Sequence, residues 1–145
     1  MFRHILIPTD GSELSMRGVR MGIDLAKTDG ARVTAIHVVP PFHSVTYMAE
    51  MLAASEANYV LESAERAKKY LEDVKKLATE AGVACQTLTV ESDRPDEVIT
   101  QAAQDQGCDV IVIASHGWRG LTKLLLGSVT QKVLLSSPVP VLVCR

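Results

Sequence analysis

Short apolar runs alternate along this chain with longer segments in which apolar residues recur every three or four positions. Apolar runs of about four to eight residues are typical of strands buried on both faces of a sheet, whereas the longer period is typical of helices packed on that sheet. The runs predict strands over 4–8, 31–39, 83–91, 109–114 and 139–144. The periodic segments predict helices over roughly 13–28, 53–81, 95–107 and 128–136.

Proline, glycine and acidic residues mark the ends of the predicted helices. Pro95 fits the first position of a helix, where its missing N–H is not needed, and Asp96 and Glu97 suit the positive end of the helix dipole. Gly107 ends this helix. Gly82 is a suitable left-handed stop for the 53–81 helix.

The alternation of strand and helix predicts the fold class. It favours an α/β fold with one doubly wound five-stranded parallel sheet and helices on both faces. We expect the common strand order 3-2-1-4-5, which leaves a crevice at the carboxyl ends of the first and fourth strands, where the winding reverses. A chain of 145 residues is long enough to bury one core, so we expect a single domain over 1–145.

This crevice brings together two segments with chemistry suited to a phosphate-bearing ligand. Gly117 and Gly127 lie between the fourth strand and the last helix, and glycine adopts positive φ and lets a ligand approach the backbone. A helix that begins near Ser128 presents free backbone N–H groups and a partial positive charge. The alternative interpretation is purely structural, since Ser128 and Gln131 also fit a capping box.

Asp10 follows the first strand and reaches the same crevice. Its carboxylate is suited to accept hydrogen bonds from ribose hydroxyls or an adenine amino group, or else to cap the first helix. Backbone N–H groups of Gly117 and of 127–129 are candidates to hold phosphates. Arg119 and Lys123 either add positive charge there or are exposed loop cations.

Several motifs resemble the universal stress protein family over the whole chain. They are Ile-Leu-Ile-Pro-Thr-Asp-Gly-Ser at 5–12, Ile-His-Val-Val at 36–39, Ala-Ser-His-Gly-x9-Gly-Ser at 114–128 and Ser-Pro-Val-Pro-Val-Leu-Val at 137–143. The resemblance implies a five-stranded α/β fold, homodimers and, in one branch, ATP bound through G-x2-G-x9-G-[S/T]. Carried over, it implies that Asp10 and the Val38 backbone lie near adenine and ribose. The implied ATP contacts are Pro8, Thr9, Asp10, Val38, Ile113, Ala114, Gly117, Gly127, Ser128 and Val129.

Ala114 departs from this motif, which has its first glycine at that position. If the position needs a positive φ, alanine costs roughly 1–2 kcal/mol. If it ends a strand in β geometry, the methyl group matters only through its contact with the ligand.

Composition argues against other classes of protein. A net charge of −2 argues against nucleic-acid binding, because no basic stripe is available to neutralise many phosphates. Cys85, Cys108 and Cys144 are far apart, which is typical of reduced thiols rather than disulfides or zinc ligands. The apolar runs are too short for a membrane span and no signal peptide is evident, so we expect a soluble, cytoplasmic protein.

No catalytic motif is complete. Ser115 and His116 are adjacent, but G-x-S-x-G and the Walker A pattern are both missing. A phosphoacceptor receiver would need an acidic pair after the first strand, where only Asp10 stands. We therefore expect no catalytic residues and at most a slow ATPase.

Two functions remain open at this level. The first is an ATP-binding regulatory protein of the stress response with weak or no hydrolysis, binding ATP with or without Mg²⁺. The second is a nucleotide-free dimer that acts through protein partners. In either case we expect homodimers that pair through the last strand, 139–143, and contact surfaces at Trp118 and 42–52.

Overall fold

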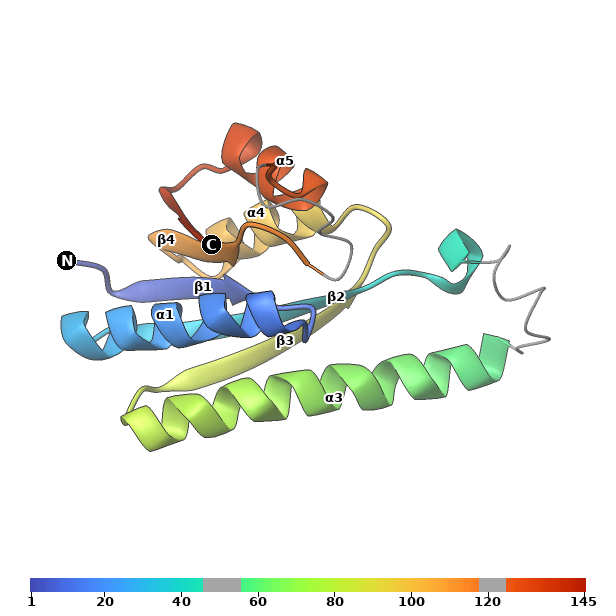
Figure 1. The fold of residues 1–145 in the computed structure, drawn as a ribbon, viewed down its shortest axis with the longest axis horizontal. Helices are drawn as coiled ribbons and strands as arrows, with labels where there is room; N and C mark the ends of the chain where they lie inside the picture. Colours follow the sequence, from blue (N-terminus) through green and yellow to red (C-terminus); the bar gives the residue numbers. More distant parts are fainter. Residues whose placement is uncertain (46–55, 118–124) are drawn as a thin grey trace.

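The sheet has five parallel strands in the order β3-β2-β1-β4-β5, as predicted (Figure 1). The computed structural model describes residues 1–45, 56–117 and 125–145. The strands are β1 (His4–Pro8), β2 (Arg32–Val39), β3 (Cys85–Glu91), β4 (Val110–Ala114) and β5 (Val141–Cys144). The helices are α1 (Glu13–Asp29), the short 3-10 turn η1 (Phe42–Val45), α3 (Glu56–Ala81), α4 (Pro95–Asp105) and α5 (Ser128–Ser136).

Helices cover both faces of the sheet (Figure 1). Successive residues of a strand point to opposite faces, so Ile5 and Ile7 of β1 enter one core and Leu6 enters the other. The first core also takes buried residues of α1 and α3, and the second takes residues of α4 and α5. The apolar runs at the centre of the sheet are continuous because each strand must fill two cores.

Two glycines allow α1 to lie close to the sheet. A Cβ added at Gly22 would overlap Ile7, and one at Gly18 would lie 3.3 Å from the backbone nitrogen of Ala114. Both glycines are buried in the helix face that packs on the sheet. The first helix is therefore held against β1 and β4, the two strands between which the crevice opens.

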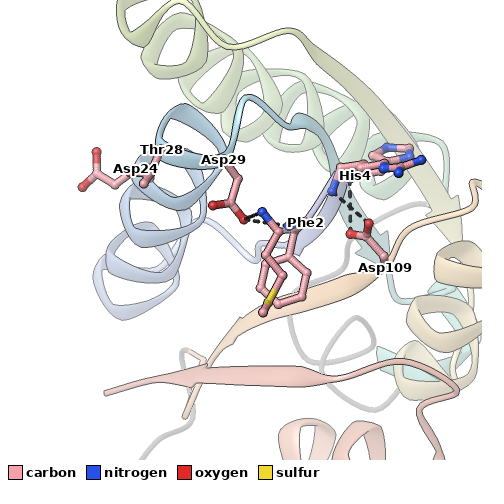
Figure 2. Close-up of polar contacts among 8 residues, drawn as sticks. Phe2, His4, Asp24, Thr28, Asp29 and Asp109 are labelled. Carbon is pink, nitrogen blue, oxygen red and sulfur yellow. Dashed lines mark hydrogen bonds and ion pairs between the residues drawn. The ribbon is translucent and has the colours of Figure 1, made fainter.

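Two carboxylates fix the amino end of β1 (Figure 2). The backbone N–H of Phe2 donates to Asp29 Oδ2 over 2.7 Å. The N–H groups of Arg3 and His4 donate to the two oxygens of Asp109, over 2.8 and 3.2 Å. These bonds hold the start of β1 between the end of α1 and the start of β4, at the opposite end of the strands from the crevice.

The segment 42–52 is described only in part. Phe42 lies in η1, and its ring is 5.5 Å from the ring of Tyr59 in α3. Positions 46–52 and Trp118, for which we expect contact surfaces, lie outside the described residues. Within the described ranges, no helix has the length and apolar character needed to cross a membrane.

Candidate functional site

A pocket opens at the carboxyl ends of β1 and β4, where the strand order reverses. It encloses about 230 Å³. Its lining comes from the ends of three strands and the first turns of three helices. The lining residues are Pro8, Thr9, Asp10, Ser15, Ile36, Val38, Pro95, Ile99, Ile113, Ala114, His116, Gly117, Val129 and Thr130.

Most of the residues predicted to contact a nucleotide surround this pocket. Eight of the ten line it: Pro8, Thr9, Asp10, Val38, Ile113, Ala114, Gly117 and Val129. The other two, Gly127 and Ser128, lie at the start of α5 but not in the lining. Arg119 and Lys123 lie outside the described residues.

The start of α5 differs from the predicted capping box. Gly127 is the N-cap, with φ −61° and ψ 152°, and Ser128 is already the first helical residue. Gln131 Nε2 donates to the Leu126 carbonyl oxygen over 3.1 Å and does not return to the N-cap. The prediction that Ser128 caps this helix is therefore wrong.

A tertiary hydrogen bond accounts for this start. Thr130 is buried, and its Oγ1 donates to the carbonyl oxygen of Ala114 over 2.8 Å. The first turn of α5 is thereby held against the end of β4, and helix α5 has no side-chain cap within the described residues. Local sequence does not encode this bond, because the two residues come from different elements.

The two crevice glycines serve close approach and not positive φ. Neither Gly117 nor Gly127 is among the glycines with positive φ, which are Gly11, Gly30, Gly82 and Gly107. The N–H of Gly127 donates to the Ser115 carbonyl oxygen over 2.7 Å, and an added Cβ would lie 3.2 Å from that oxygen. An added Cβ at Gly117 would overlap Asp10 Oδ2.

Ala114 is the last residue of β4 and has strand geometry. It pairs with Cys144 of β5, and the next N–H, of Ser115, donates to the Cys144 carbonyl oxygen over 2.7 Å. Position 114 therefore does not need a positive φ, and alanine causes no backbone strain there. Ala114 lines the pocket, and its methyl group lies toward Gly18 of α1.

The turn that carries Asp10 is held by side-chain hydrogen bonds. Asp10 Oδ1 accepts the N–H of Ser12 over 3.0 Å, and Ser15 Oγ accepts the N–H of Asp10 over 3.1 Å. Ser12 caps α1, because its Oγ accepts the N–H of Ser15. The alternative role of Asp10 as the cap of this helix is thus wrong, and its Oδ2 remains directed to Gly117.

Ser115 and His116 are in hydrogen-bond contact with each other. Ser115 is 3% exposed, and its Oγ lies 2.9 Å from His116 Nδ1. The hydroxyl is shielded from solvent, and its contact with Nδ1 orients the His116 ring. His116 Nε2 is buried and makes no hydrogen bond with the described residues.

Six lining residues were not predicted: Ser15, Ile36, Pro95, Ile99, His116 and Thr130. Ile36 was accessible to sequence reasoning, because it lies two positions before Val38 and so faces the same side of β2. Pro95 and Ile99 reach the pocket because α4 starts at the carboxyl end of the sheet. His116 stands inside the motif at 114–128, directly before Gly117.

The cysteines with raised pKa values lie outside the pocket. Burial raises the pKa of Cys108 to about 11, and it also raises the pKa of Cys85. Both therefore remain protonated near neutral pH, and neither lines the pocket. The described part of the chain has no group of three or more acidic, His or Cys side chains placed to hold a metal ion.

Comparison with known proteins finds relatives that share this fold over nearly the whole chain. The structure of protein MJ0577 of Methanocaldococcus jannaschii, a universal stress protein, is 31% identical, with a TM-score of 0.83, and the match covers 99% of this chain and 96% of that one. A universal stress protein structure in complex with cAMP is 21% identical, with a TM-score of 0.70 over 99% and 97% of the chains. One from Archaeoglobus fulgidus in complex with dAMP is 18% identical, with a TM-score of 0.69 over 100% and 98%.

A family-wide comparison covers the entire sequence. The model of the universal stress protein family matches residues 1–145. The matched strand order, the motifs at both ends of the chain and the pocket between β1 and β4 all lie within this range. The chain belongs to the universal stress protein family.

Proposed function

We propose that this chain is an ATP-binding regulatory protein of the stress response, with weak or no hydrolysis. The observation that carries the proposal is the pocket in which Asp10, after β1, meets Gly117, after β4, beside the start of α5. In open α/β sheets, ligands bind outside the carboxyl ends of the strands at such a point.

The pocket is large enough to enclose only part of a nucleotide. About 230 Å³ is below the ~300–1,000 Å³ typical of pockets that enclose a whole small molecule. Base and sugar therefore occupy the pocket, and the phosphates extend from its mouth. Ser128, which does not line the pocket, is then in place to meet the phosphates with the backbone N–H groups of the first turn of α5. The N–H of Gly127 is bonded to the Ser115 carbonyl oxygen, so Gly127 contributes only by allowing close approach.

The lining suits an adenosine group. Ile36, Ile99 and Ile113 present apolar surface to a base, and the Val38 backbone is available for its polar edge. Asp10 is the acidic residue of the lining and accepts hydrogen bonds from sugar hydroxyls. The strand geometry of Ala114 supports the proposal, because the departure from the glycine motif carries no backbone strain.

The complexes of relatives agree with an adenine nucleotide. Two universal stress proteins were solved with cAMP and with dAMP, and both have this fold. They support the choice of adenine, while the choice of ATP rests on the start of α5 beside the pocket.

We expect weak or absent turnover, because among the described residues no group is placed to act as a catalytic base or acid. The Ser115 hydroxyl is buried, and His116 Nδ1 is engaged with it. In the described residues no cluster of ligands is ready for Mg²⁺, so any magnesium ion would be held chiefly by the phosphates. Phosphoryl transfer normally needs such positioned groups.

The proposed assembly is a homodimer through β5. This strand is at the edge of the sheet, and Leu142 is 40% exposed on it. Leu134 and Leu135 of α5 are exposed nearby in the sequence, at 41% and 89%. This apolar surface also favours the second candidate function, a dimer that binds no nucleotide and acts through protein partners.

Titration calorimetry of ATP into protein freed of nucleotide by denaturation and refolding tests the proposal. We expect saturable binding at micromolar to submillimolar ATP and phosphate release far slower than one turnover per second, with CD spectra to verify the fold. If folded protein binds no ATP at millimolar concentration, the nucleotide proposal fails and the partner-only function stands.

A further inference from the structure

Strand β2 sends successive residues to opposite faces of the sheet beside the crevice. Ile36 and Val38 line the pocket, whereas His37, between them, faces the side covered by α3 and is buried. His37 is therefore next to the pocket in sequence but separated from it by the sheet.

His37 holds the first residue of the Asp10 turn. Its Nδ1 lies 2.8 Å from the carbonyl oxygen of Thr9. A carbonyl oxygen only accepts, so Nδ1 must carry the hydrogen. The N–H of Thr9 donates to the carbonyl oxygen of Ile36 over 2.9 Å, so both backbone groups of Thr9 are bound to β2.

Tyr70 of α3 completes the support from the same side. Its ring meets His37 edge to face, with centroids 5.3 Å apart and planes at 77°. The ring also lies against Gly11, where an added Cβ would overlap ring atoms. Gly11 has φ +79°, so the turn bends sharply at the point where Tyr70 covers it.

We propose that His37 and Tyr70 are positioning residues that fix the 9–11 turn from behind the sheet and so place the Asp10 carboxylate for recognition of the sugar hydroxyls. Neither residue lines the pocket, so both act through Asp10. This inference rests on the proposed nucleotide site. It adds that sugar discrimination depends on a contact between β2 and α3 on the far face.

The mechanism is restriction of the carboxylate's position. Asp10 Oδ1 is held by Ser12, and Oδ2 lies against Gly117, so the carboxylate has little room on the pocket side. Without the His37 bond and the Tyr70 ring, the turn can move away from Gly117. A hydrogen bond to a charged acceptor is then lost first, because it depends steeply on geometry.

The test measures a ratio of dissociation constants, that for 2′,3′-dideoxy-ATP over that for ATP. For the wild type we expect about tenfold or more, because the analogue lacks both hydroxyls. His37→Ala and Tyr70→Ala should lower the ratio below about threefold, and Asp10→Ala should abolish it. A variant that only loses stability would instead keep the wild-type ratio of dissociation constants in the protein that remains folded.

Conservative variants provide the matched controls. His37→Asn keeps an N–H donor near the Nδ1 position, and Tyr70→Phe keeps the ring over Gly11, so both should retain the wild-type ratio. If the alanine variants fail to fold, Tyr70→Leu keeps an apolar side chain over Gly11 but removes the ring contact with His37, and it should lower the ratio by itself. In the Asp10→Ala background, His37→Ala should have no further effect on the ratio.

The outcomes separate this inference from the proposed function. If the wild type binds no ATP, both fall together. If it binds ATP with equal affinity for the dideoxy analogue, or if folded His37→Ala and Tyr70→Ala keep the full ratio, only the positioning role is overturned.

Discussion

The carboxylate of Asp10 lies directly against Gly117, so that a single methyl group at position 117 would occupy the place of Oδ2. The two residues lie in the loops that follow different strands, and they meet only because β1 and β4 are neighbours in the sheet. Glycine is required here by the carboxylate and not by backbone dihedral angles.

Gly117→Ala is therefore expected to displace Asp10 and weaken ATP binding by about tenfold or more, because a charged hydrogen bond is lost. Titration calorimetry measures the affinity, and circular dichroism verifies the fold. Gly82→Asn is the control, since Gly82 ends α3 in open space and asparagine tolerates its φ of +73°. Unchanged affinity in a folded Gly117→Ala protein would contradict the assigned role of this contact.

Gly127→Val is expected to abolish ATP binding while the protein stays folded. A side chain at this N-cap covers the first N–H groups of α5, and its Cβ already lies 3.2 Å from the Ser115 carbonyl oxygen. Ser128→Ala should weaken binding much less, because the backbone donors remain. Since Ser128 is not the cap, the free energy of unfolding of the Ser128→Ala protein should differ from that of the wild type by less than about 0.5 kcal/mol. A loss of about 1 kcal/mol or more would restore the capping role.

The buried His4 side chain predicts loss of stability in acid. Burial and the nearby Arg32 charge lower the pKa of His4, although Asp109 acts in the opposite direction. Because the pKa is lower in the folded protein than in the unfolded chain, the neutral form of His4 contributes its full stability above the unfolded pKa of about 6.5. This stability is lost as the pH falls below about 6.5 toward the folded pKa. Urea unfolding between pH 7.5 and 5 should show a decline of at most about 1.4 kcal/mol per pH unit from this group.

The matched variant for this decline is His4→Gln, which keeps a polar partner for Thr34, whose Oγ1 lies 2.7 Å from His4 Nε2. It should flatten the dependence between pH 6.5 and 5. An identical slope in both proteins would assign the decline to other groups.

Leu142→Glu is expected to convert the proposed dimer into a monomer, because it places a charge on the exposed apolar face of the edge strand. Sedimentation velocity at micromolar concentration measures the change. Leu61→Glu on α3 is the control, since Leu61 is also exposed, at 66%, but is not on the edge strand. A monomeric wild type would refute pairing through β5.

The fold was predictable because the strands at the centre of the sheet are buried on both faces. The run at 4–8 matches β1 and the periodic segment at 128–136 matches α5 residue for residue. The last strand begins at Val141 rather than at 139, because Pro138 and Pro140 have no N–H to donate to a ladder. Pro140 still accepts, through its carbonyl oxygen, the N–H of Ile111.

The proximity of Asp10 to the 113–117 segment could be predicted from the strand order. The hydrogen bonds and ring contacts that fix the start of α5 and the position of Asp10 could not. The cap of α5 depends on Thr130 binding the end of β4, and a local pattern of Ser128 and Gln131 cannot register that bond. The support of Asp10 by His37 and Tyr70 crosses from one element to another through the sheet. Such pairings depend on register and helix placement, which periodicity does not specify.

Helix α5 is only nine residues long, yet its two sides serve different neighbours. Val129 and Thr130 in its first turn line the pocket, while Leu134 and Leu135 in its last turn are exposed. If a nucleotide shifts this helix, both the ligand and a second copy of the chain act on one rigid rod. By thermodynamic reciprocity, any factor by which the nucleotide changes the dimerisation constant is the factor by which dimerisation changes nucleotide affinity.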